Sequence, residues 1–386
     1  MSWISRNEKS LVASWYYSVD RKLLALLFVL IFVGALSVIS AGSIQAYRKH
    51  WEWYYFLQKM LPFYIVGIGT LFASSMLNKK WVLFFAALNV VFCALLLFWT
   101  VANPHTINGS DRWAVIGGLR LMPSDIIKPG LVILTAWFLS KMKQLYGSNM
   151  FLNRESWRLV CFSWWTYLIP FALMLFIMLM HPDIGTTILF LTVVGGMFFV
   201  AGLPYKILLP ALGGCLGAAG FIFLLFPQTF NHFTSRISDF FAPLDPTSQV
   251  GISVRTIRQG GFFGMGDEAF AKESLADAHT DFIFAALVED WGAIGACAIL
   301  FIFLLVWRHL IQTALSVRDR FVFYAVFGAG LLFIMQTCIN LATTLGMIPP
   351  KGMTLPFISY GGSSFMGYCL LFGMIMALVR EDKWNK

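Results

Sequence analysis

Two carboxylates and an imidazole directly precede an apolar run in the C-terminal half of the chain. In "ADAHTDFIFAAL", Asp277, His279 and Asp281 stand immediately before residues 282–287. The run predicts a membrane-spanning helix that begins near Thr280, with Asp281 in its first turn. The backbone dipole keeps a carboxylate ionised at that position, and a positioned carboxylate can act as a general base. Asp281 is therefore compatible with both a capping and a catalytic role.

Two more acidic residues lie further along the same predicted helix. Glu289 and Asp290 follow Asp281 by roughly 12 Å at 1.5 Å per residue, which places them at membrane depth. Charge at that depth indicates either polar contacts between helices or support for a nearby site.

Basic residues flank another helix start, in "NGSDRWAVIGGLRLMPSDIIKPG" (108–130). Ser124 is expected to be the N-cap, with Asp125 in the first turn. Lys128 then lies about one turn inside the helix. It either snorkels to the membrane interface or, with Arg112 and the free amides of the helix start, holds an anionic ligand.

A polar break in "MHPDIGTT" separates two apolar spans. Asp183 and Gly185 predict a tight turn in which Asp183 caps the following helix. The long segment after residue 226 contains Arg236 and a glycine-rich stretch, "GGFFGMG" (260–266). Its glycines allow turns and close approach to a ligand, but the spacing matches neither a Walker loop nor a dinucleotide fingerprint.

The stretch "IPPKGMTLPFISYGG" (348–362) makes a regular helix improbable, although it lies between two apolar spans. Pro349, Pro350 and Pro356 interrupt the backbone pattern. Irregular backbone near a membrane must be covered by protein or line a wet cavity. We expect this segment, including Lys351, to form part of the wall of a site.

The composition predicts an all-α polytopic membrane protein. The chain has 386 residues, of which 59% are hydrophobic and 12% charged, far from the soluble range. No cleavable leader, zinc motif or Walker loop is visible, and the six cysteines fall in or beside apolar spans, which favours buried thiols. Ten spans are expected, at about 23–43, 55–76, 81–101, 125–141, 160–180, 186–202, 206–227, 282–307, 321–343 and 359–379.

The net charge of +9 follows the expected topology. With ten spans and both termini in the cytoplasm, more than half of the 28 basic residues fall in cytoplasmic loops and tails, as the positive-inside bias requires. The excess charge therefore does not indicate nucleic-acid binding. The predicted tails are 1–22 and 380–386, and the membrane domain is 23–379, with extracytoplasmic loops at about 102–124, 228–281 and 344–358.

Together these stretches resemble the SEDS family (shape, elongation, division and sporulation) of bacterial peptidoglycan polymerases. "NGSDRWAVIGGLRLMPSDIIK" is similar to the family's "NGARRWI…QPSE…K", "HPDIGTT" to "QPDLGT", "GGFFGMG…LADAHTDFIFA…ED" to "GG.FG.G…LPEAHTDFIFA…EE", and "IPPKGMTLPFISYGGSS" to its most recognisable signature. The form "PKGMTLPF" is more similar to division members than to elongation members. Asp125, Asp277 and Asp290 stand where the family more often has Glu, which shortens three side chains without loss of charge.

The resemblance implies lipid II as substrate, a disaccharide-peptide on undecaprenyl pyrophosphate that is polymerised outside the cytoplasmic membrane. Because a β-linked chain forms from an α-linked donor, one inverting displacement suffices, and Asp281 is the family-matched base. The pyrophosphate leaves without a proton and needs neutralising charge. The expected substrate-binding residues are Arg112, Lys128, Arg236, Lys351, Ser359, Gly361 and Gly362, and the expected supporting residues are Asp183, Asp277, His279, Thr280 and Glu289.

No cofactor is required by the sequence, although a divalent cation, Mg²⁺ or Mn²⁺, would help to neutralise the pyrophosphate. The implied partners are a class B penicillin-binding protein transpeptidase and other division proteins at the septum, besides the membrane lipids. Two alternatives from other classes stay open: a lipid II flippase, since polar groups in a helical bundle also suit transport, and a non-catalytic scaffold for a cell-wall synthase. Within the family, an elongation-type polymerase is the further alternative.

Overall fold

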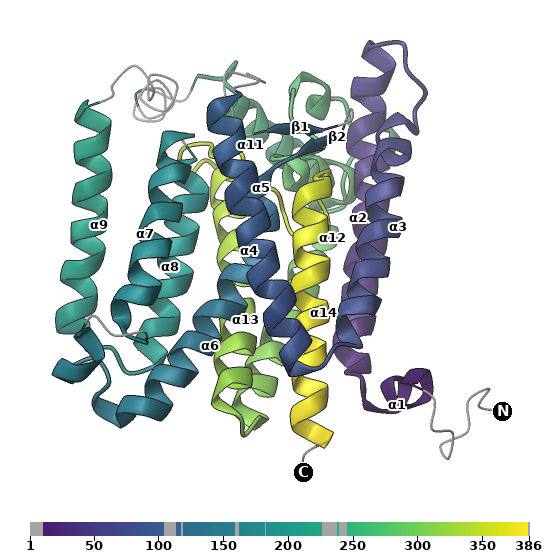
Figure 1. Cartoon of the computed structure of the whole chain (residues 1–386). Helices are drawn as coiled ribbons and strands as arrows, with labels where there is room; N and C mark the ends of the chain where they lie inside the picture. The colour runs from purple at the N-terminus through teal and green to yellow at the C-terminus, as the bar shows by residue number, and fades with distance from the viewer. Residues whose placement is uncertain are drawn as a thin grey trace.

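The computed structural model describes residues 11–103, 113–116, 119–158, 162–181, 183–225, 238 and 245–384. The chain is mostly helical (Figure 1). The longer helices are α2 (Arg21–Arg48), α3 (Tyr55–Ser75), α4 (Lys79–Ala102), α6 (Lys128–Tyr146), α7 (Trp164–Met180), α8 (Ile184–Val200), α9 (Tyr205–Leu225), α11 (Gln249–Gly260), α12 (Ile283–Ser316), α13 (Arg320–Thr344) and α14 (Gly362–Trp384). Shorter helices are α1 (Leu11–Ser18), α5 (Pro123–Ile126) and four-residue or shorter 3₁₀ turns such as η5 (Ala271–Ser274).

The helices confirm a multi-pass membrane protein. Six of them, α2, α3, α4, α12, α13 and α14, are long and apolar enough to cross a membrane, and α7 and α8 are apolar but shorter. Each of the ten predicted spans overlaps a helix, whereas their number across a membrane stays a prediction. The described ends of the chain, at α1 and at the C-terminal end of α14, lie at the same end of the bundle (Figure 1).

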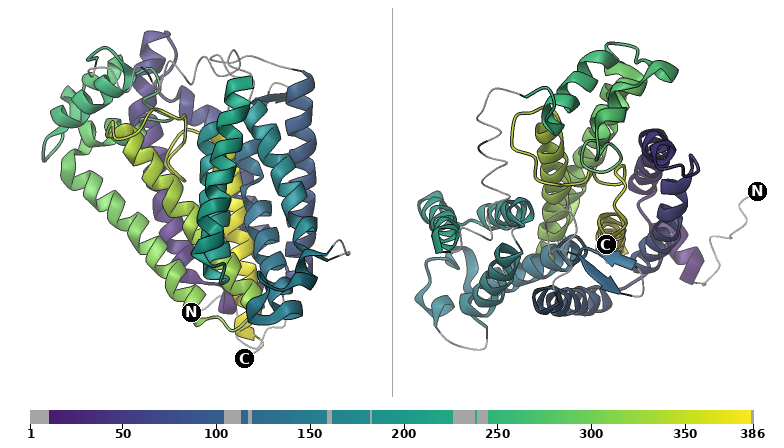
Figure 2. Two further views of the ribbon diagram at one scale, coloured as in Figure 1. Left: turned by 90° about the vertical axis from the view of Figure 1, so that its left-hand side faces the viewer. Right: turned by 90° about the horizontal axis from the view of Figure 1, so that it is seen from above.

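Helix α14 forms the centre of the bundle. In the most apolar 18-residue stretch of α14, 83% is buried, compared with 28% in the corresponding stretches of α3 and α4. Figure 2 shows α14 surrounded by other helices when the molecule is seen from above. Small residues allow this close packing: a Cβ on Gly67 of α3 would lie 2.4 Å from the Phe365 ring, and one on Gly373 would lie 1.9 Å from Ser74 Oγ. Residues of α14 are thus positioned by contacts on all sides.

A short hairpin adds a small antiparallel sheet to the helices. Strands β1 (Ala114–Ile116) and β2 (Leu119–Leu121) pair with Val115 opposite Arg120. The hairpin leads directly into α5. The all-α prediction did not include these strands, because strands of three residues are too short to produce a recognisable alternation of apolar and polar residues.

Helix α12 departs from the predicted boundaries at its start and is kinked. It begins at Ile283, with Phe282 as N-cap, and runs to Ser316. Gly292, with φ 69° and ψ −176°, breaks the helical geometry two residues after Asp290. The kink frees backbone groups that bond to the segment before the helix: Ala293 N donates to Gly261 O at 2.9 Å.

Candidate active site

A buried loop between α13 and α14 forms one wall of the site. Residues 353, 355 and 357–359 are buried in the bundle. Phe357 adopts φ 64°, which a bulky side chain rarely does, and its ring packs against Phe365, Tyr368 and Phe372. Gly34 lets the loop approach α2, since a Cβ there would lie 2.2 Å from Phe357 O. Packing on both sides therefore holds a conformation that isolated backbone would avoid.

This loop fixes the backbone that precedes α12. Tyr360 N donates to His279 O at 2.8 Å, and Ser359 Oγ donates to Thr280 O at 2.6 Å. Ser359 Oγ also accepts from Leu355 N at 2.8 Å. The structure thus gives the Ser359 hydroxyl internal partners as donor and as acceptor, so the residue positions the chain around Asp281.

Asp281 lies where the buried loop, α12 and α13 meet. Its carbonyl accepts from Asn340 Nδ2 at 2.9 Å, and the same amide nitrogen donates to Met353 O at 2.7 Å. The loop passes close to the carboxylate at Gly352, where φ is 66° and a Cβ would lie 3.5 Å from Asp281 Oδ2. The structure therefore brings Asp281 beside the Lys351–Gly352 backbone.

The predicted first-turn position of Asp281 is wrong. The residue precedes the N-cap Phe282, and no acidic residue lies in the first turn of α12. Tight turns replace the expected helical turn, with Thr280 N and Phe282 N both bonded to Asp277 O, at 3.2 and 3.3 Å. The reason is competition: the carbonyls of residues 279–281 bond to the loop and to α13, so they do not take part in a helical ladder.

His279 is a buried aromatic contact. Its ring centroid lies 4.2 Å from that of Phe56 and 5.3 Å from that of Tyr360. Burial, with a smaller effect of the positive charge on Lys49, lowers the pKa of His279 to about 4. The imidazole is therefore neutral near pH 7. The supporting role of His279 stays a prediction.

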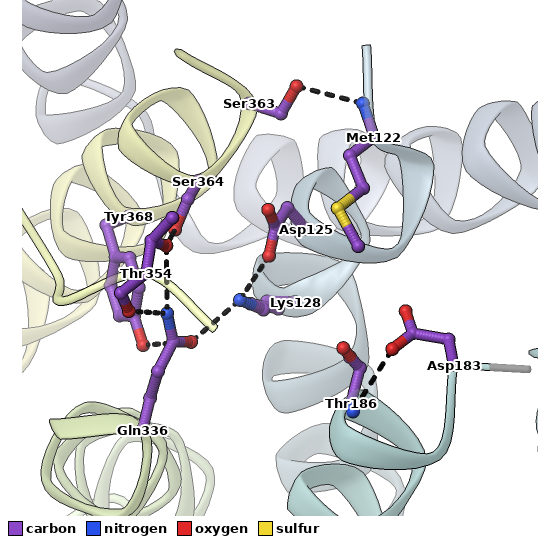
Figure 3. A network of polar contacts seen from close by, with 10 residues as sticks. All are labelled: Met122, Asp125, Lys128, Asp183, Thr186, Gln336, Thr354, Ser363, Ser364 and Tyr368. Atoms are coloured by element: carbon purple, nitrogen blue, oxygen red, sulfur yellow. Dashed lines mark hydrogen bonds and ion pairs between the residues drawn. The ribbon is translucent and has the colours of Figure 1, made fainter. Parts of the chain in front are cut away.

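Lys128 is held inside the bundle by a polar network (Figure 3). Its side chain is 2% exposed, and Nζ donates to Asp125 Oδ1 at 2.6 Å and to Gln336 Oε1 at 2.7 Å. Tyr368 also donates to Gln336 Oε1, at 2.9 Å. The snorkelling interpretation of Lys128 is therefore wrong. The role of Lys128 in substrate binding stays a prediction, although its ammonium already has protein partners.

The same network reaches the buried loop and the hairpin. Gln336 Nε2 donates to Thr354 O at 2.8 Å, and Thr354 Oγ1 donates to Ser364 Oγ at 3.0 Å. Ser363 Oγ accepts from Met122 N at 2.9 Å. Met122, and not Ser124, is the N-cap of α5, because Pro123 starts the helix and Ser124 lies buried within it. The predicted capping by Ser124 is wrong for this reason.

Lys351 and Asp183 belong to the same region. A Cβ on Gly185 would lie 3.2 Å from Lys351 Cβ, so the start of α8 packs against the loop. Asp183 caps α8 as predicted, accepting from Thr186 N at 3.4 Å. Burial lowers the pKa of the half-buried Lys351 ammonium from its ordinary value.

Glu289 and Asp290 tie the segment before α12 to the bundle. The buried carboxylate of Glu289 accepts the N–H groups of Ala271 and Lys272, at 2.6 and 2.8 Å. Asp290 pairs with Lys272 and accepts from Ser40 Oγ at 2.5 Å. Both acidic residues therefore hold the segment that leads to Asp281, whereas the supporting role predicted for Glu289 in the reaction stays a prediction.

The glycine-rich stretch approaches protein backbone. A Cβ on Gly260 would lie 2.0 Å from Val288 O, and one on Gly264 would lie 2.2 Å from Asp290 O. Gly361 and Gly362 instead lie against side chains, because a Cβ on Gly362 would lie 2.5 Å from the Phe63 ring and one on Gly361 would lie 3.0 Å from the Thr354 methyl group. The expected ligand approach at Gly260 and Gly264 is thus replaced by close packing against α12.

Arg112 and Arg236 lie outside the described residues, so their roles in substrate binding stay predictions.

Within the described ranges, no three His, Cys, Asp or Glu side chains come together as a metal site. Asn340 and Gln336 contact the site but were not among the residues predicted from the sequence. The stretch "MQTCIN" indicates them, because it places Gln336 and Asn340 one helical turn apart inside an apolar span, where polar groups are costly and often functional.

The described residues thus define a multi-pass helical membrane protein with a polar site between a buried loop and the start of α12. The chain belongs to the FtsW/RodA/SpoVE family, described as cell cycle protein, whose family model matches residues 20–384.

Curated relatives cover nearly the whole chain. It is 30% identical over 383 residues to a probable peptidoglycan glycosyltransferase FtsW of Caulobacter vibrioides, covering 98% of this chain and 93% of the relative. It is 30% identical over 385 residues to the protein of the same name from Saccharophagus degradans, covering 95% of each.

Solved structures share the fold. The rod shape determining protein RodA of Thermus thermophilus matches 94% of this chain and 97% of its own, with a TM-score of 0.66 and 22% identity. A chain of a peptidoglycan synthase complex that coordinates polymerisation and crosslinking matches 94% of this chain and 98% of its own, with a TM-score of 0.72 and 23% identity.

Proposed function

We propose that this chain is a peptidoglycan glycosyltransferase that polymerises lipid II on the outer face of the cytoplasmic membrane. Membership of the FtsW/RodA/SpoVE family supports the reaction class. The observation that carries the residue assignment is the position of Asp281, whose carbonyl is held by Asn340 and whose carboxylate lies against Gly352. A side chain on backbone fixed in this way is suited to act on one defined proton.

The proposed chemistry is a single inverting displacement. The acceptor 4-hydroxyl oxygen attacks the anomeric carbon of the donor, the bond from that carbon to the pyrophosphate oxygen breaks, and the hydroxyl proton passes to the Asp281 carboxylate. The departing pyrophosphate takes the electron pair as an anion. No covalent intermediate on the protein is needed, because one displacement converts the α-linked donor into a β-linked product.

Positive charge is proposed to stabilise the pyrophosphate. Lys351 is the described candidate, since it adjoins Gly352 and therefore lies near Asp281. Arg112 and Arg236, which are not among the described residues, are proposed to add further positive charge. Lys128 is proposed to act mainly through Asp125 and Gln336, which connect it to the wall of the site. Help from a divalent cation, Mg²⁺ or Mn²⁺, in neutralising the pyrophosphate is a further proposal, which chelation followed by addition of either ion checks.

The decisive experiment compares lipid II polymerisation by wild type, Asp281→Asn and Asp277→Asn, each purified with its transpeptidase partner at matched abundance. Asp281→Asn keeps the shape of the side chain and removes the base, so we expect loss of polymer by more than about 100-fold. Asp277→Asn, in the same turn, should keep most of the activity. Normal polymer from Asp281→Asn would disprove the base assignment. Transbilayer movement of lipid II without polymerisation by the wild type would favour a flippase.

We further propose a role in septal wall synthesis with a class B penicillin-binding protein. Support comes from curated relatives named FtsW and from the structural match to a chain of a synthase complex. The inner membrane with both termini in the cytoplasm is the proposed location. A fluorescent fusion should gather at the septum during division, whereas a signal spread along the side wall would indicate the elongation role.

A further inference from the structure

A second polar site lies far from Asp281, where α4 and α13 start and α6 ends, near the C-terminal end of α14. It is a pocket of about 340 Å³, within the range of small-ligand sites. Arg320 in this pocket and Asn340 beside Asp281 are both on α13, twenty residues apart, which is about 30 Å along a helix. The lining includes Lys79, Trp137, Ser140, Lys141, Gln144 and Arg320.

The charges in the pocket favour an anion. Three basic side chains and one acidic side chain, Asp319, line it, which leaves a formal excess of two positive charges. The Asp319 carboxylate is already engaged, because it pairs with Lys79 and caps α13 by accepting from Phe321 N at 2.8 Å. Within the described ranges, Lys141 and Arg320 form no salt bridge, and both are exposed. Two cations therefore face the pocket without a carboxylate of their own.

The remaining lining suits a phosphate group. Ser140 supplies a hydroxyl, and the Gln144 amide accepts from Lys141 Nζ at 3.3 Å, which keeps that ammonium at the pocket. Arginine and lysine both bind phosphate oxygens through charge-assisted hydrogen bonds. The Trp137 indole adds an aromatic surface of the kind enriched at the level of lipid headgroups.

The surroundings indicate that the phosphate comes from the membrane. An apolar row on α4 starts two residues after Lys79, and Trp81, Phe84, Leu88 and Leu95 are each at least 50% exposed. Acyl chains must cover this row in a bilayer, so lipid headgroups reach the level of the pocket. Basic pockets between membrane helices are suited to anionic lipid headgroups.

We propose that this pocket binds the phosphate headgroup of an anionic membrane lipid. The site depends on neither Asp281 nor the glycosyltransferase reaction, so its test reads out binding alone.

The test uses native mass spectrometry of the full chain in a neutral detergent, titrated with phosphatidylglycerol or with phosphatidylcholine. The pocket variant is Lys141→Gln with Arg320→Gln. The matched control is Lys80→Gln with Arg318→Gln, which removes the same charge from two exposed residues that adjoin Lys79 and Asp319 in the sequence. A charge-keeping variant, Lys141→Arg with Arg320→Lys, separates lost charge from lost folding.

We expect wild type, control and charge-keeping variant to bind phosphatidylglycerol more tightly than phosphatidylcholine. Binding to the pocket variant should be roughly 25-fold weaker, at about fivefold for each of the two basic residues near a lipid surface. An equal loss in the control, or no loss in the pocket variant, would overturn the proposal. Full displacement of the lipid by inorganic phosphate at equal concentration would assign the pocket to a soluble phosphate and overturn the lipid source.

Discussion

At the scale of single residues, the candidate site depends on side chains that hold backbone carbonyls. Asn340 uses one amide nitrogen to join Asp281 O and Met353 O, and Ser359 joins Thr280 O to the same loop. Such bonds matter for the proposed mechanism, in which Asp281 as the base must lie within hydrogen-bond reach of one hydroxyl proton. Asn340 is therefore a positioning residue for Asp281.

Replacing Asn340 should reduce activity more than abundance. Asn340→Ala removes the donor from two carbonyls, and a base displaced by about 1 Å can lose about 100-fold in rate. We expect a fall in the polymerisation rate of that order at constant substrate KM. Thr337→Ala, one turn earlier on α13, removes a hydroxyl that bonds only within its own helix and should stay close to wild type. Equal loss in both variants would show general damage to α13.

His279 should make stability depend on pH. Its pKa is lowered from 6.5 to about 4 by burial, so the unfolded chain takes up a proton on acidification before the folded chain does. Protonation of His279 therefore does not change the free energy of unfolding above about pH 7. As the pH falls from 6.5 to 4, it lowers the free energy of unfolding by up to about 3 kcal/mol. His279→Phe should flatten this part of the curve of Tm against pH in detergent. An unchanged slope would mean that the imidazole is accessible to protons in the folded protein.

At the scale of elements, α12 must bend to meet the segment that carries the site. Gly292 supplies the bend, and the freed backbone bonds to residues 261–265, while Glu289 and Asp290 hold η5. Sequence patterns predicted a position that overlaps a helix for each expected span, and the irregular segment between α13 and α14, because both depend on local composition. They did not predict the start of α12 or the partners of Ser359, because distant carbonyls and donors decide these features.

Gly292→Ala should destabilise the protein. The residue has φ 69° and ψ −176°, a region open almost only to glycine, and a Cβ would lie 2.3 Å from Phe262 O. We expect a loss of at least about 2 kcal/mol, with lower polymerase activity because the segment before Asp281 moves. Gly69→Ala on α3 is the control, since a Cβ there meets nothing within 4 Å. The measurements are the Tm and the rate of lipid II polymerisation of both variants. Equal Tm values for the two variants would refute the requirement for glycine at position 292.

At the scale of the whole molecule, the two ends of the bundle are stabilised separately. The site lies at one end, and at the other end three consecutive residues of α14 bind different helix ends. Arg380 donates to Met76 O and Leu77 O, at 2.9 and 3.0 Å, at the end of α3. Glu381 accepts from Lys79 N at 2.6 Å and Asp382 from Asp319 N at 3.1 Å, at the starts of α4 and α13. Each charge has the sign that the local helix dipole favours.

This arrangement predicts that stability and catalysis can be separated. Glu381→Gln with Asp382→Asn keeps the side-chain shapes but removes the charges from two helix starts, at about 1 kcal/mol each. We expect a lower Tm, with the rate of lipid II polymerisation unchanged at temperatures well below it, because Asp281 is held by other contacts. Glu155→Gln, which removes a charge from an exposed pair with Arg158, should leave both quantities unchanged. A fall in rate at full folding would instead show that the end of α14 is coupled to the site, along the helix whose Tyr368 and Ser364 belong to the network around Lys128.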